Sequence, residues 1–134
     1  STLDRSSAAS DVYKRQMLTQ LPALLSPTQL LAIQDEVRKQ TTSPALVRYI
    51  HALVQSSREH ADVRLGLSPR AGLALRRAAQ SWSWLQGRQH VLPEDVQAVF
   101  VSCAAHRLQA REARHGRHAG EALAASLLAD VAVP

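Results

Sequence analysis

The sequence predicts an all-α fold, a small bundle of about four to five helices in one domain. Alanine, leucine, glutamine and arginine recur throughout, while aromatic residues make up only 4% and glycine occurs 5 times, a composition that favours helices over strands. Serine–proline pairs recur along the chain as helix starts. A length of 134 residues is enough for one core and too short for two ordinary domains.

Residues 1–16 form a leader that we expect to be disordered. This stretch lacks apolar periodicity and is rich in serine and charge. It resembles a translated cloning or sequencing linker more than native protein, so it is left out of the fold prediction. The predicted domain covers residues 17–134.

Two serine–proline pairs predict the first two helices. Ser26-Pro27 opens a helix to about residue 39, with Gln29 at the capping-box position. Ser43-Pro44 opens a second helix to about residue 57, and residues 58–67 form a connecting loop. Apolar stripes on both helices predict faces toward a core. The stripes consist of Leu30, Leu31, Ile33 and Val37, and of Leu46, Val47, Ile50, Leu53 and Val54.

The third predicted helix begins at Ser68-Pro69 and ends near Gly87. Ser68 can cap the first free amides, and Pro69 fits the first helical position. On a helical wheel one arc is apolar, and we expect it to face the core, with Arg70 and Arg77 along its edge. The arc consists of Ala71, Ala74, Leu75, Ala78, Ala79, Trp82 and Leu85.

Arg70 is the candidate functional residue, because it lies in the first turn of this helix. A cation there meets the positive end of the helix dipole and costs ~0.3–1 kcal/mol, so an anion should offset it. One candidate is a phosphate, since first-turn amides and an arginine form an anion site together. The other is a nearby carboxylate, Glu59 or Asp62. Spacing alone favours the carboxylate, because most arginines are structural or solvated.

Pro93-Glu94-Asp95 begins a fourth helix with carboxylates where the dipole favours them. This arrangement is the reverse of that at Arg70. A short amphipathic helix is expected over residues 121–129. The inward residues of the fourth helix are predicted to be Val96, Val99, Phe100, Cys103, Ala104 and Leu108.

A basic segment joins these two helices, with arginines recurring at helical spacing over residues 106–118. Its functional interpretation is a phosphate-facing surface. A solvated helix face or loop is favoured instead, because no aromatic side chain is interleaved to stack on bases. The arginines are Arg107, Arg111, Arg114 and Arg117.

Charge and composition exclude some classes of function but do not identify one. The net charge of +5 is compatible with nucleic acid, phosphorylated ligands or a basic surface. The single cysteine, Cys103, excludes an intramolecular disulfide, and His115 and His118 lack a third nearby ligand, so no metal site is predicted. We find neither a membrane-spanning stretch nor a secretory signal and expect a cytoplasmic protein.

The motifs of a complete active site are missing from the sequence. There is no Gly-x-x-x-x-Gly-Lys-Ser/Thr loop, no Gly-x-Ser-x-Gly and no His-Glu-x-x-His. We therefore expect this chain by itself to be inactive as an enzyme.

Several motifs in a fixed order resemble the C-terminal lid of MoxR-family AAA+ ATPases. They are Gly66-Leu67-Ser68-Pro69-Arg70-Ala71, the alanine-rich helix with Trp82, Gly87-Arg88, Val91-Leu92-Pro93-Glu94-Asp95-Val96 and His106-Arg107-Leu108. The resemblance covers about residues 17–134 and implies an AAA+ lid-type bundle. It implies that Arg70 is the second sensor arginine and that Arg70 and Ser68 face the nucleotide. ATP and Mg²⁺ would be bound by a P-loop core that this chain lacks.

The resemblance also implies partners for the parent protein. These are the P-loop core, a homo-oligomeric ring that is usually hexameric, and a von Willebrand factor A-domain protein, in a chaperone-like role in protein maturation. Neither a membrane nor a nucleic acid is expected. Two alternatives stay open: a basic helical module that binds nucleic acid through residues 107–117, and an interaction-only bundle with Arg70 locked to Glu59 or Asp62.

Overall fold

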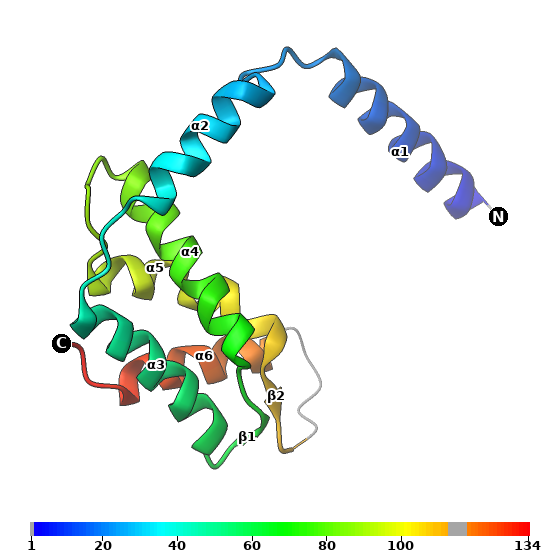
Figure 1. Ribbon diagram of the computed structural model, residues 1–134. Helices are drawn as coiled ribbons and strands as arrows, with labels where there is room; N and C mark the ends of the chain where they lie inside the picture. Colours follow the sequence, from blue (N-terminus) through cyan, green and yellow to red (C-terminus); the bar gives the residue numbers. More distant parts are fainter. Residues whose placement is uncertain (1, 113–117) are drawn as a thin grey trace. The chain divides into compact units, whose positions relative to one another are not determined.

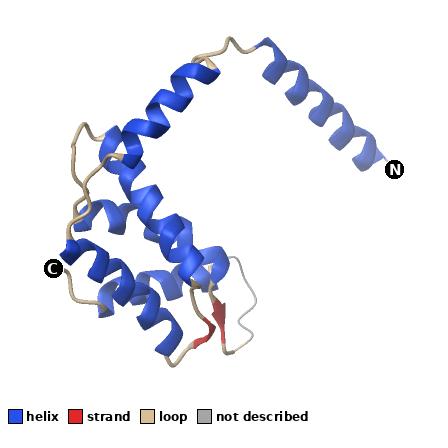
Figure 2. Cartoon of the chain, in the orientation of Figure 1, coloured by secondary structure: helices blue, strands red, loops and turns tan. Residues whose placement is uncertain are grey.

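The computed structural model describes residues 2–112 and 118–134, and it is mostly helical with one small sheet (Figure 1, Figure 2). The predicted fold class is confirmed. The helices are α1 (Thr2–Gln20), α2 (Pro27–Arg38), α3 (Pro44–Glu59), α4 (Pro69–Leu85), α5 (Pro93–Ala104) and α6 (Ala119–Asp130). The shorter elements are β1 (Val63–Leu65), the 3-10 turn η1 (Ala105–Arg107) and β2 (Gln109–Ala110). Within the described residues no helix is long and apolar enough to cross a lipid bilayer.

The leader differs from the expectation of disorder, because Thr2–Gln20 forms helix α1. This stretch contains neither glycine nor proline, and its alanine, lysine, arginine and glutamine residues are good helix formers. The side chains of residues 6–20 are all exposed. Helix α1 therefore forms from local propensity, and its residues 6–20 bury no apolar face.

The chain divides into two compact units, Ser1–Ala32 and Ile33–Pro134. In the first unit the side chains of residues 6–32 are exposed, so Leu30 and Leu31 of the predicted α2 stripe do not reach a core. In the second unit Ile33 and Val37 are half-buried. Helix α2 thus has the predicted position in the sequence, but its apolar stripe is not buried as expected.

The core of the second unit lies among α3, α4, α5 and α6. Helix α4 runs alongside α5, and α6 packs against α5 and η1. Because aromatic residues are few, aliphatic side chains fill most of this core around one phenylalanine. The largest fully buried apolar side chains are Phe100, Leu46, Leu53, Leu75, Leu127 and Val96.

Helix α4 buries a different face from the one that the wheel predicts. Trp82 and Leu85 were expected in the core, yet they are 39% and 67% exposed. Gln80 and Ser83, which were not in the predicted arc, are buried. The core face is therefore rotated toward these two polar residues, which have buried hydrogen-bond partners. The members of the predicted arc that are fully buried are Ala71, Leu75 and Ala79.

The small antiparallel sheet is not predicted by the sequence. Strand β1 lies in the stretch predicted as a connecting loop, and strand β2 lies in the predicted basic segment. Val63 pairs with Ala110 and Leu65 with Gln109, with an irregularity between the two pairs. Strands of two and three residues are too short to show a period of two in the sequence. Their pairing depends on the tertiary structure, which brings the end of α3 beside the segment after η1.

Candidate functional site

The first turn of α4 holds both residues predicted for the site, Ser68 and Arg70. Ser68 has the extended backbone of an N-cap residue, and its Oγ accepts a hydrogen bond from Ala71 N at 3.2 Å. Pro69 takes the first helical position, where no N–H partner is needed. Arg70 is therefore the second residue of the helix, as predicted. The Ser68 hydroxyl acts as the helix cap, and its contact with a nucleotide stays a prediction.

The backbone just before α4 is fixed against the end of α3. Leu67 N donates to Ser57 Oγ at 2.8 Å, and Ser57 Oγ donates to Val54 O at 2.6 Å, with all three residues buried. A Cβ atom at Gly66 would lie 2.7 Å from Ser57 O, too close for any other residue without a shift of the backbone. These contacts anchor the start of α4, and with it the Cα of Arg70, to the core.

The Arg70 side chain is exposed and has no partner across residues 6–112 and 118–134. No ion pair in this part of the chain involves its guanidinium. Glu59 accepts a hydrogen bond from Gln55 Nε2 at 2.7 Å, and Asp62 forms no ion pair there either. The local carboxylate that spacing favoured is thus not in place, and within the part of the chain that the structure describes the helix start carries a cation without a counter-ion.

This arrangement predicts that Arg70→Ala stabilises the chain. Because a cation at a helix N-terminus is repelled by the dipole, its removal should raise the free energy of unfolding by about 0.3–1 kcal/mol relative to Arg77→Ala. Arg77 is exposed in the middle of the same helix, so this control cancels the difference in helix propensity between arginine and alanine. Urea denaturation measures both variants. A less stable Arg70→Ala chain would mean that a local anion pairs with Arg70.

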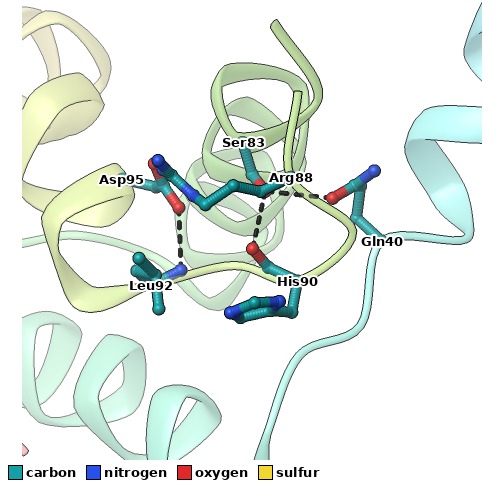
Figure 3. A network of polar contacts seen from close by, with 6 residues as sticks. All are labelled: Gln40, Ser83, Arg88, His90, Leu92 and Asp95. Atoms are coloured by element: carbon teal, nitrogen blue, oxygen red, sulfur yellow. Dashed lines mark hydrogen bonds and ion pairs between the residues drawn. The ribbon is translucent and has the colours of Figure 1, made fainter. Parts of the chain in front are cut away.

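At the other end of α4 lies a buried polar network that the sequence analysis missed (Figure 3). Ser83 Oγ lies 2.7 Å from His90 O and 3.0 Å from Gln40 Oε1. Gln80 Nε2 donates to Gln40 O at 3.1 Å. A hydroxyl has one hydrogen, so Ser83 serves one of its two acceptors at a time. The available signal was two polar residues three positions apart, beside the apolar row of α4.

Asp95 forms the second part of this network (Figure 3). Its Oδ2 accepts a hydrogen bond from Leu92 N at 2.7 Å, and its Oδ1 accepts one from Arg88 Nη2. The Asp95 side chain is 1% exposed and that of Arg88 30%, so the pair is largely withdrawn from water. Arg88 Nε is buried without a partner among the described residues. The predicted place of Asp95 in the first turn of α5 is confirmed, whereas no pattern in the sequence indicates Arg88 as its partner.

The basic segment lies only partly within the described residues. Arg107 in η1 donates to Cys103 O at 3.1 Å. Arg111 follows β2, and its backbone N donates to Asp62 O at 2.9 Å. These two arginines are therefore on different elements and do not share the helical strip that their spacing suggests. Residues 113–117 of the predicted segment lie outside the described residues, and they include Arg114, His115 and Arg117.

Cys103 lies half-buried against the core, as the small apolar side chain expected of it. Burial raises the pKa of its thiol, while the charge of Arg107 acts in the opposite direction. A raised pKa keeps the thiol protonated, which disfavours a role as a nucleophile. Among the described residues no group of three histidine, cysteine, aspartate or glutamate side chains is placed to hold a metal ion.

Comparison with known proteins gives one family match and several relatives. Residues 55–126 match the family described as AAA lid domain. The protein YeaC of Bacillus subtilis is 30% identical over 122 residues, which are 90% of this chain and 38% of YeaC. MoxR of Paracoccus denitrificans is 43% identical over 79 residues, 49% of this chain and 23% of that protein. Chaperone MoxR1 of Mycobacterium tuberculosis is 33% identical over 98 residues, 66% of this chain and 26% of that protein.

A solved structure shares the fold. It is the crystal structure of a Cytophaga hutchinsonii protein described as an ATPase, with a TM-score of 0.71 and 26% sequence identity over 86% of this chain. The match covers 38% of that protein. The chain thus spans well under half the length of the relatives and of the solved structure that it matches.

Proposed function

This chain belongs to the AAA lid domain family and is a lid of the MoxR type of AAA+ ATPase, and on that premise we propose that Arg70 is its second sensor arginine. Such an arginine reaches from the lid onto the phosphates of ATP bound by the P-loop core. The observation that carries the proposal is the exposed Arg70 guanidinium, held at a helix start without a counter-ion in the described residues. An anion supplied from outside this chain would remove the unfavourable dipole interaction.

The chemistry of Arg70 suits a transferred phosphoryl group. A guanidinium is planar, stays charged at all physiological pH values and can donate two parallel hydrogen bonds to phosphate oxygens. When the γ-phosphoryl group leaves, negative charge spreads over its oxygens, and a positioned cation stabilises that charge. Arg70 would therefore bind most strongly during hydrolysis and more weakly afterwards, so that the lid responds to the nucleotide state.

ATP and Mg²⁺ fit this chain only in part. Arg70 and Ser68 supply one cation and one hydroxyl at the start of α4, and the sequence contains no phosphate-binding loop. These residues would contact the triphosphate, while the P-loop core would hold it together with the metal ion, which neutralises the phosphate charge. In this proposal the chain by itself is not an ATP hydrolase.

The parent protein that we propose is a chaperone-like ATPase that matures other proteins or complexes. The word chaperone in the description of the Mycobacterium tuberculosis relative supports this role. Membership of the AAA lid family supports a P-loop core and a homo-oligomeric ring, with six subunits as the expected number. A von Willebrand factor A-domain partner is proposed from the family resemblance, and a cytoplasmic location follows from the need for ATP.

A binding experiment tests the proposal. We expect a fluorescent ATP analogue to show negligible binding to this chain, because one arginine and one hydroxyl cannot hold a triphosphate in water. Saturable binding should appear when the P-loop core is joined to the chain or added in trans. Fluorescence anisotropy titrations with and without the core measure both. Tight binding to the chain by itself would contradict the proposal.

A further inference from the structure

The last turn of α4 is tied to the segment that leads into the lid. Gln40 lies between α2 and α3, and its side chain and carbonyl oxygen contact Ser83 and Gln80 of α4 at 3.0 and 3.1 Å. All three residues are buried. We call them the Gln40 cluster; Figure 3 shows Gln40 and Ser83 facing each other between the incoming segment and α4.

Further bonds join the same two segments. Thr41 N donates to Gln89 O at 3.1 Å, and Val91 N donates to Thr41 O at 2.9 Å. These two backbone bonds form a parallel bridge between the incoming segment and the turn after α4. At the surface, Trp84 Nε1 donates to Glu36 Oε2 at 2.9 Å and so ties the end of α4 to the last turn of α2.

Helix α4 carries Arg70 at the opposite end from these bonds. At about 1.5 Å per residue, Arg70 and Ser83 are about 20 Å apart along the helix axis. The intervening residues are continuous α-helix without proline, and Leu75 and Ala79 are buried in the core. Helix α4 is also anchored to the core at its start, so it moves as a rigid rod together with that core, and a displacement of its Ser83 end displaces Arg70 with it.

We propose that the Gln40 cluster positions Arg70. The cluster holds α4 at a fixed angle to residues 39–43, the segment through which a P-loop core connects to the lid, so α4 moves when this segment moves. A C-terminal lid follows its core in the sequence, so movement of the core reaches the second unit through α2 and residues 39–43. Gln40, Gln80 and Ser83 are thus positioning residues, and none of them touches the nucleotide. This inference rests on the function proposed for Arg70.

Hydrogen bonding explains why polar residues occupy this buried place. Apolar side chains of similar volume would fill the space, but they would allow α4 to slide or rotate against the incoming segment. Directional bonds from Ser83 and Gln80 to one residue fix a single register. Breaking one of these bonds leaves a buried acceptor without a donor, which costs free energy. This cost confines the incoming segment to the observed arrangement.

The test uses the protein that includes the P-loop core, with Ser83→Ala as the variant and Ser81→Ala as its matched control. Ser81 is exposed two residues away on the same helix, and its hydroxyl donates a hydrogen bond to Arg77 O within the helix. We expect Ser83→Ala to lower kcat for ATP hydrolysis about five- to tenfold with little change in KM. Ser81→Ala should retain the original kcat.

A second pair of measurements separates positioning from general damage. In a protein that already carries Arg70→Ala, adding Ser83→Ala should lower kcat less than about twofold, because the Arg70 guanidinium that the cluster positions is already absent. Equal loss with and without Arg70 would overturn the inference and indicate a structural role. If Arg70→Ala itself leaves hydrolysis unchanged, the function proposed for Arg70 fails. If Arg70→Ala strongly lowers kcat and Ser83→Ala behaves like Ser81→Ala, only the positioning role fails.

Trp84→Phe provides a variant that should fold even if Ser83→Ala does not. It keeps an aromatic ring, though a smaller one, at a half-exposed site and removes the indole N–H donated to Glu36. We expect a smaller loss of kcat, about two- to threefold, which again disappears in the Arg70→Ala protein. A loss that persists there, or no loss at all, counts against the proposed linkage.

Discussion

Replacement of Arg70 by alanine in the protein that includes the P-loop core is expected to lower kcat for ATP hydrolysis about a hundredfold or more. The expected loss is large because, in the proposed role, the guanidinium would meet charge that develops on the phosphate oxygens of ATP, and a lid closed over the core would shield this interaction from water. Its position at the start of α4 is held by the Ser68 cap and the contacts around Leu67. The rate of phosphate release at saturating ATP measures this change in kcat.

Two controls define what the loss means. Arg77→Ala removes an exposed arginine farther along the same helix and should change kcat little. Arg70→Lys keeps the charge and loses the planar fork, so its kcat should fall between those of the original protein and Arg70→Ala. Unchanged hydrolysis in Arg70→Ala would show that this side chain does not act on the nucleotide.

Replacement of Asp95 by alanine is expected to destabilise the chain by about 3 kcal/mol, near the lower end for a broken buried ion pair. Without this carboxylate, Leu92 N loses its acceptor and the Arg88 guanidinium loses its counter-ion. The loss is not larger, because the Arg88 side chain is 30% exposed and water can solvate part of it. Urea denaturation monitored by circular dichroism measures the change in the free energy of unfolding.

Glu94→Ala serves as the control for Asp95→Ala, since Glu94 is an exposed acid in the same first turn of α5. Both variants lose a carboxylate near the helix dipole, so their difference isolates the buried contacts. We expect Glu94→Ala to cost less than about 1 kcal/mol. Equal stability of the two variants would show that the Arg88–Asp95 pair contributes nothing beyond the dipole interaction.

Helix starts were the most predictable part of this fold. Three of them carry a serine–proline pair, and the helices begin at Pro27, Pro44 and Pro69 as expected. Ser43 and Ser68 each cap their helix, because their Oγ atoms accept a hydrogen bond from the backbone N–H three residues on. Such caps involve only neighbouring residues, which is why the sequence reveals them.

The buried face of α4 was predicted less well. The wheel placed Trp82 in the core because tryptophan is large and apolar, yet the ring is partly exposed and Ser83 is buried instead. A hydroxyl can be buried where hydrogen-bond acceptors lie within reach. For Ser83 these acceptors are Gln40 Oε1 and His90 O. No periodicity in α4 can indicate acceptors that lie on other segments.

The sequence by itself determined the helical class, the starts of the helices at Pro27, Pro44, Pro69 and Pro93 and the place of Arg70 in a first turn, because short-range capping and composition decide them. The tertiary structure decided that Glu59 and Asp62 leave Arg70 unpaired in the described residues, and that Arg88 and Gln40 have buried partners. The physical reason is the distance along the chain between the residues that interact. A cap is set by residues three positions apart, whereas the partner of a charge or of a buried amide depends on how distant segments pack.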